Sequence, residues 1–196
     1  MAHCLFRKRS SKLGRQRVML KLDFENGFNL ASRMLSLNEV RTHLPRIYAF
    51  LHAAYSACSS LYYEEHTIAS QEGSQQGDPC GPLNFSMNAC RADLLLDEIP
   101  DCFRIWFIDD LTLEVDIGAL ARTLEILTSF EQFGLKLNWN KCELIVAQED
   151  MLPDFQQRFP QFGIYHTTNR WELLGAPIGD ADATDDVILR LCQNTQ

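Results

Sequence analysis

The chain has 196 residues, 46% of them hydrophobic, and a formal net charge of −8. This length supports one sizeable hydrophobic core. No run of about 18 apolar residues predicts a membrane helix, and the first residues lack the apolar segment of a secretory signal. Seven scattered cysteines without a Cys-x-x-Cys pair argue against a disulfide framework and a zinc site. We therefore expect an intracellular protein, cytoplasmic or nuclear.

Charge is unevenly distributed along the chain. Residues 1–17 contain six Lys and Arg side chains and no acid, so the remaining residues carry a net charge of −14. Such a leader could contact phosphates or serve as a nuclear address, or it is a disordered, solvated tail. We predict a basic leader at 1–17, one domain at 18–179 and a C-terminal tail at 180–196.

The first predicted element is a strand over residues 18–24, where polar and apolar residues alternate. One face would carry Val18, Leu20 and Leu22, and the other Met19, Lys21 and Asp23. The strand therefore ends in an acid. Residues 30–60 have helical spacing that is interrupted near Pro45.

A loop and a second set of elements follow. Residues 71–82 concentrate three glycines and two prolines, and Pro82 opens a predicted helix. A further helix over 120–130 stops at Gly134. Residues 135–147 are predicted to be a strand, and 170–179 a short hairpin. The helix after Pro82 is expected to present one apolar face made of Leu83, Met87, Cys90 and Leu94.

Between these elements, the sequence RIWFIDDLTLEV at 104–115 predicts two strands around Asp109 and Asp110. Aspartate is common in turns, so a purely structural role is open. However, Asp23 also ends an apolar strand, and three carboxylates at one sheet edge would repel without a counter-ion. Oxygen-only ligands favour Mg²⁺ or Mn²⁺. Two such ions about 3.5 to 4 Å apart serve in-line phosphoryl transfer.

Five segments stand out along the chain, in this order: LKLDFENGFN, QQGDPCGPLNF, FIDDLTLEV, FGLKLNWNKCELI and WELLGAPIG. They resemble, in the same order, the palm motifs of reverse transcriptases of non-LTR and related retroelements. The resemblance implies an α+β polymerase palm, with an antiparallel sheet that carries an Asp-Asp hairpin and packs on helices. It also implies an RNA-directed DNA polymerase that uses two Mg²⁺ or Mn²⁺ ions, an RNA template, a DNA primer and dNTP substrates.

The resemblance assigns roles to ten residues. Metal-binding catalytic carboxylates would be Asp23, Asp109 and Asp110, and Lys141 would neutralise or protonate the pyrophosphate. Phe28 would block the ribose 2′-hydroxyl of the incoming nucleotide, with further nucleotide contacts from Phe24, Gln76 and Gly77. Leu174 and Gly175 would grip the primer.

Ordinary structural roles stay open for several of these positions. Phe28 could be a core residue, Gln76 and Gly77 part of a simple turn, and Lys141 a solvated surface side chain.

The chain departs from the family pattern at both ends. Only 22 residues precede Asp23 and 17 follow the last motif, so we expect the fingers and thumb to be largely missing. Two alternative functions remain. One is an inactive or domesticated palm that only binds nucleic acid or protein. The other is an RNA-dependent RNA polymerase palm, against which Phe28 argues.

Overall fold

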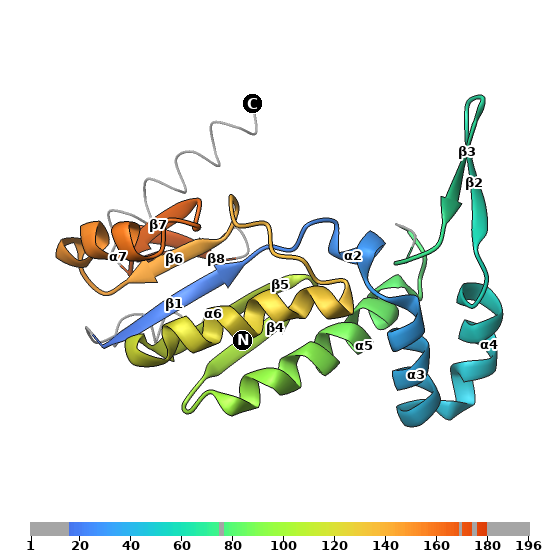
Figure 1. Cartoon of the computed structure of the whole chain (residues 1–196), viewed down its shortest axis with the longest axis horizontal. Coiled ribbons are helices and arrows are strands. Elements are labelled where there is room, and N and C mark those ends of the chain that lie inside the picture. The colour runs from blue at the N-terminus through green and yellow to red at the C-terminus, as the bar shows by residue number, and fades with distance from the viewer. Residues whose placement is uncertain (1–15, 75–76, 169, 174–175, 180–196) are drawn as a thin grey trace.

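A mixed sheet flanked by helices forms the body of the protein (Figure 1). A computed structural model of the chain describes residues 16–74, 77–168, 170–173 and 176–179. The strands are β1 (Arg17–Leu22), β2 (Ser59–Tyr63), β3 (His66–Ser70), β4 (Phe103–Phe107), β5 (Asp110–Asp116), β6 (Glu143–Val146), β7 (Ile164–Thr167), β8 (Arg170–Leu173) and β9 (Ala176–Gly179). The α-helices are α2 (Gly27–Leu30), α3 (Arg33–His43), α4 (Pro45–Tyr55), α5 (Gly81–Asp93), α6 (Leu120–Ser129) and α7 (Leu152–Arg158).

The described strands of the main sheet run in the order β4-β5-β1-β6-β7-β8-β9. The predicted antiparallel sheet is confirmed for every pair but one, because β6 and β7 are parallel. The chain passes through α7 between these two strands, and a crossover of this kind lets the second strand run in the direction of the first. The expected α+β polymerase fold is otherwise present.

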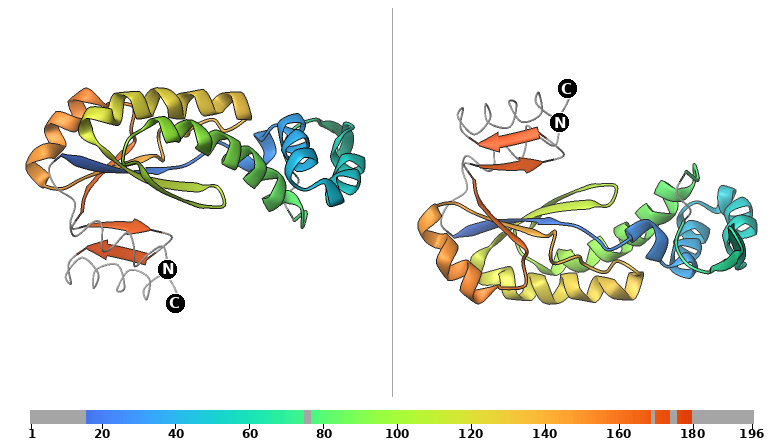
Figure 2. Two further views of the ribbon diagram at one scale, coloured as in Figure 1. Left: turned by 90° about the horizontal axis from the view of Figure 1, so that it is seen from below. Right: turned by 90° about the horizontal axis from the view of Figure 1, so that it is seen from above.

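Strand β1 has the two faces that its alternation predicts. Val18, Leu20 and Leu22 are buried in the main core, together with residues of α5 and α6. Met19 on the other face is also buried, because it packs with Ile145 against a second apolar cluster. That cluster contains Trp171, Leu173 and Ile178 from β8 and β9. Figure 2 shows this hairpin on the side of the sheet opposite α5 and α6.

Three helix features agree with the sequence. Helices α3 and α4 are separated at Leu44, directly before Pro45. Helix α5 has Pro82 in its first turn. The helical segment that begins with α6 ends at Gly134, which adopts the left-handed conformation with φ 78°.

The predicted apolar face of α5 is wrong in part. Leu83 and Met87 pack on α3 and α4, whereas Cys90 and Leu94 are exposed. The main core instead receives Phe85, Ala89 and Ala92. Helix α5 lies between two apolar clusters, so a single hydrophobic stripe does not describe it.

Three further features differ from prediction. Only Glu143–Val146 of the expected strand at 135–147 is a strand, and the preceding residues form turns, with one isolated bridge between Phe24 and Leu137. The hairpin of β2 and β3 was not predicted. It projects with α3 and α4 from one end of the sheet (Figure 1). Arg17, assigned to the leader, is the first residue of β1.

Candidate active site

Asp23 directly follows β1 and is anchored through its backbone. Its carbonyl accepts a hydrogen bond of 2.9 Å from the amide of Asn138. The thiol of Cys142 donates to the same carbonyl at 3.7 Å. Since Leu22 and Phe24 on either side are buried in the core, strand alternation directs the carboxylate to the opposite face of the sheet.

Asp109 and Asp110 lie where β4 turns into β5. Phe107 pairs with Asp110, so the connection is the two-residue turn Ile108-Asp109. Ile108 has φ 55°, which is an unfavourable backbone conformation for a β-branched residue. A strained backbone conformation persists only where the surrounding structure holds it in place. Such conformations are concentrated at functional sites.

The sheet register places these carboxylates at the same end of the neighbouring strands β1 and β5, which we call the carboxylate edge of the sheet. Leu22 pairs with Leu111, so Asp23 follows β1 beside the position where Asp110 begins β5. Burial raises the pKa of Asp110, and the negative charges of Asp109 and Asp23 raise it further, against an opposing effect of Lys21. The three predicted carboxylates therefore share one electrostatic environment.

The donor chemistry at this edge fits a hard divalent cation. All three side chains offer oxygen ligands, and their mutual repulsion is what a bound cation would relieve. Within the described ranges, no group of three or more Asp, Glu, His or Cys side chains is arranged to hold a metal ion. Asp23, Asp109 and Asp110 are the side chains at this site that could supply oxygen ligands to one.

A charged network missed by the sequence analysis lies on the same face. Lys21 Nζ contacts Glu143 Oε1 at 2.7 Å, and His166 Nε2 contacts Glu143 Oε2 at 3.1 Å. Burial alone would raise the pKa of Glu143, but the hydrogen bonds from His166 and Lys21 outweigh it and lower the pKa. The alternation of β1 could have placed Lys21 beside Asp23, but its partner is 122 residues away in the chain.

The two phenylalanines near Asp23 have different environments. Phe28 on α2 is half-buried and stacks on Phe85, with ring centroids 5.0 Å apart. Phe24 is only 7% exposed and stacks on Trp106 at 5.5 Å. Strand alternation therefore turns the Phe24 ring into the core, and the nucleotide contact predicted for Phe24 stays a prediction.

The loop before α5 is described only in part. Gly77 has φ 89°, and a Cβ at that position would meet no atom within 4 Å. Its neighbour Asp78 accepts hydrogen bonds from the Tyr55 hydroxyl and, at 2.7 Å, from the Cys80 amide. Gln76, Leu174 and Gly175 lie outside the described residues.

Lys141 lies on an exposed turn rather than on a strand. Its amide donates to the Asn138 carbonyl at 2.9 Å, and the Asn138 amide donates to the Asp23 carbonyl. The turn that carries Lys141 is thus attached to the backbone of the first carboxylate.

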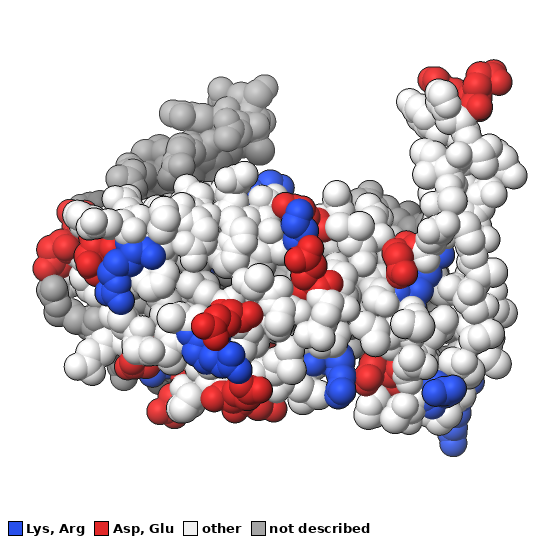
Figure 3. Space-filling view, viewed as in Figure 1, with Lys and Arg blue, Asp and Glu red and all other residues white. Residues whose placement is uncertain are grey.

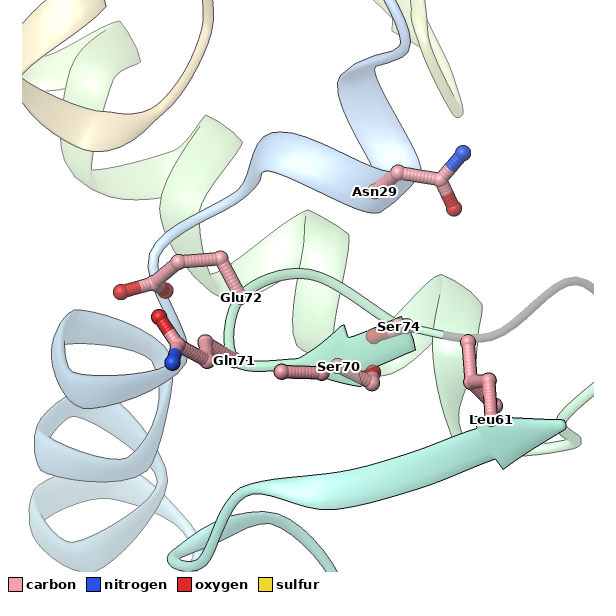
Figure 4. A pocket seen from close by; sticks show the side chains of 7 residues that line it. Asn29, Leu61, Ser70, Gln71, Glu72 and Ser74 are labelled. Atoms are coloured by element: carbon pink, nitrogen blue, oxygen red, sulfur yellow. The ribbon is translucent and has the colours of Figure 1, made fainter. Parts of the chain in front are cut away.

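A pocket of about 590 Å³ lies beside α2. Asn29 lines one side and Ser70, Gln71 and Ser74 line the other (Figure 4). The pocket therefore lies between α2 and the loop that follows β3, next to the residue after Phe28.

The surface has no single charge character on the face in Figure 3. Acidic and basic side chains are interspersed there, and acidic side chains occupy the tip of the β2–β3 hairpin. That tip consists of Glu64 and Glu65. In the described part of the chain, no helix is both long and apolar enough to cross a bilayer.

Solved structures with a similar fold include telomerases. Apo telomerase from Candida tropicalis has a TM-score of 0.63 and 10% sequence identity, covering 91% of this chain and 34% of its own. Telomerase from Candida albicans, solved with the TWJ fragment of telomeric RNA, has a TM-score of 0.59 and 13% identity, covering 92% of this chain and 33% of its own. The chain thus spans about a third of their length. At these identities the likeness concerns the fold.

Sequence comparison identifies the family. No curated protein matches the chain. The family described as "Reverse transcriptase (RNA-dependent DNA polymerase)" matches residues 1–178, which include every residue predicted for the candidate site. The chain therefore belongs to the reverse transcriptase family.

Proposed function

We propose that this chain is the catalytic palm of an RNA-directed DNA polymerase from a retroelement. It would add dNTPs to the 3′-hydroxyl of a DNA primer paired with an RNA template, in the cytoplasm or nucleus. The observation that carries the proposal is the meeting of Asp23 with the Asp109-Asp110 turn at one sheet edge, as the register of β1 and β5 places them.

Each carboxylate would have a defined part in the reaction. Two Mg²⁺ or Mn²⁺ ions, when bound, would activate the primer 3′-oxygen and stabilise the leaving pyrophosphate. Asp23 and Asp110 are held by the sheet and would fix the position of those ions, and Asp109 would add a ligand from the turn. The 3′-oxygen then forms a bond to the α-phosphorus as the bond to pyrophosphate breaks.

Two other residues would act on the nucleotide. The ring of Phe28 would clash with a 2′-hydroxyl and so favour deoxyribonucleotides. Lys141, on its turn beside Asp23, would neutralise or protonate the departing pyrophosphate. We include Gln76 and Gly77 in the nucleotide site, and Leu174 and Gly175 in a primer grip.

Primer extension on an RNA template tests the proposal. We would compare wild type, Asp109→Asn and the control Asp154→Asn, an exposed aspartate on α7 paired with Arg158. With dNTPs and Mn²⁺, wild type and the control should extend the primer, and Asp109→Asn should lose at least about a hundredfold in rate.

Each other result has a definite meaning. Full activity of Asp109→Asn would remove that aspartate from the mechanism. If wild type fails to extend but retains labelled primer–template at low salt, the chain is a binding module. Equal use of NTPs and dNTPs would instead favour an RNA polymerase.

A further inference from the structure

The short helix α2, which carries Phe28, is held on its outer side by the loop that follows β3. The Gly73 amide donates to the Ala31 carbonyl at 2.9 Å, and the Ser74 amide donates to the Phe28 carbonyl at 2.7 Å. Gly73 has φ 66°, and a Cβ there would lie 2.2 Å from the Asn29 carbonyl oxygen. The loop and α2 therefore touch backbone to backbone.

A second glycine limits α2 from another segment. Gly134, at the end of the α6 segment, would place a Cβ only 1.9 Å from the Leu30 carbonyl oxygen. The α2 backbone is thus seated against two glycines from distant parts of the chain. Phe28 itself rests on Phe85, so its ring has support below and its backbone has support on either side.

Arg33 on α3 holds the outer loop in place. Its Nε donates to the Gly73 carbonyl at 2.6 Å, and its two terminal nitrogens donate to the Ser70 carbonyl and hydroxyl, both at 2.7 Å. The guanidinium also lies 5.4 Å from the centroid of the Tyr55 ring. Arg33 is only 7% exposed, so its guanidinium interacts with these protein groups rather than with solvent. A planar, forked donor is needed to reach both ends of the loop at once.

We propose that Arg33 is a positioning residue for sugar selection, acting through the loop at 70–74 on α2 and Phe28. This inference rests on the proposed function, since it assumes that Phe28 screens the sugar. A ring can reject a 2′-hydroxyl only if it cannot retreat. The pocket beside Asn29 offers α2 room to move, so the contacts from Gly73 and Ser74 are what prevent that movement (Figure 4).

The test measures preference for dNTPs over NTPs, as the ratio of the two kcat/KM values. We would compare wild type with Arg33→Lys and Arg33→Met. Lysine keeps the positive charge but lacks the forked guanidinium donor, and methionine lacks both. Both variants should therefore lower the preference for dNTPs over NTPs about tenfold, mainly through a lower KM for NTPs. Ser70→Ala removes the hydroxyl that accepts one of the Arg33 hydrogen bonds, and it replaces the Arg33 variants in this test if they do not fold.

Arg158→Met is the matched control. Arg158 also lies near aromatic rings, those of Phe155 and Phe159, and pairs with Asp154. It belongs to α7, at the opposite end of the molecule from α3 (Figure 1). Its loss should leave the sugar preference unchanged, because it has no contact with the loop at 70–74.

Amide hydrogen exchange supplies a readout that does not depend on activity. The Gly73 and Ser74 amides should exchange at least about tenfold faster in the Arg33 variants than in wild type or Arg158→Met. Unchanged exchange, or an unchanged sugar preference in folded Arg33 variants of an active enzyme, would overturn this inference and leave the proposed function intact. A wild type that incorporates no dNTP would overturn the proposed function and this inference with it.

Discussion

The carboxylate edge of the main sheet and the β2–β3 hairpin are both built from antiparallel strands, but they are supported differently. Every residue of β5 between Leu111 and Val115 is buried, whereas every residue of β2 is exposed. The sheet edge is held by a core on both faces of β1, while the hairpin is connected to the body at its base. The first arrangement suits a site that must keep its geometry, and a two-stranded ribbon alone is marginally stable in water.

The largest expected contrast is in stability. Leu113→Ala removes a fully buried side chain paired with Leu20 and should lower the free energy of unfolding by about 2 to 5 kcal/mol. Tyr62 on the hairpin is 81% exposed, so Tyr62→Ala should change the free energy of unfolding by less than about 0.5 kcal/mol. Urea unfolding of both variants measures the contrast. Equal losses would show that the hairpin is packed in solution.

A smaller effect is expected at β4, the edge strand that leads into the Asp109-Asp110 turn. Asp93 on α5 accepts hydrogen bonds of 2.8 Å from both Arg104 and Trp106. Asp93→Ala should therefore cost about 1.5 to 3 kcal/mol in unfolding free energy.

Asp97 provides the control for this prediction. It also pairs with Arg104, but its side chain is 62% exposed. Asp97→Ala should cost less than about 1 kcal/mol by the same unfolding measurement. If the two substitutions cost the same, Asp93 does not secure the edge strand.

The smallest predicted effects depend on pH and have opposite signs for Glu143 and Asp110, two acidic residues on the same face of the sheet. The pKa of Glu143 is lowered in the fold, so its contribution to stability is present above its unfolded pKa and is lost as pH falls through the folded value. Glu143→Gln should lose about 1 kcal/mol at pH 7, and the difference from wild type should close in acid.

Asp110 should show the opposite sign. Its pKa is raised in the fold, so wild type loses stability as pH rises through the window above the ordinary value of 3.8. Asp110→Asn should therefore be more stable than wild type at pH 7 and equal to it in acid. Thermal unfolding across pH measures both variants. A less stable Asp110→Asn at pH 7 would mean that repulsion does not dominate this edge.

Much of the sheet edge could be predicted because local patterns specify it. Alternation in β1 determined which side chains face the core, and the two apolar runs around Asp109 and Asp110 indicated the hairpin. Pro82 and Gly134 marked a helix start and a helix end through backbone constraints that belong to the residues themselves.

The parts that were missed depend on distant partners or on unusual backbone conformations. The β2–β3 turn contains Glu64 with φ 50° and lacks the glycine or asparagine that normally announces such a turn. The two-sided helix α5, the Lys21–Glu143 pair and the Arg33 contacts each require knowledge of what lies across the fold. Phe28 could be predicted as a candidate, but the segments that hold it could not.

Manganese binding tests most directly the claim that carboxylates from separate strands form one site. Isothermal titration would compare wild type with Asp23→Asn, Asp109→Asn and the control Asp154→Asn. We predict saturable binding of Mn²⁺ by wild type and by the control. Either Asp23→Asn or Asp109→Asn should weaken this binding at least about tenfold. Binding that is unchanged in both Asp23→Asn and Asp109→Asn would contradict the shared metal site.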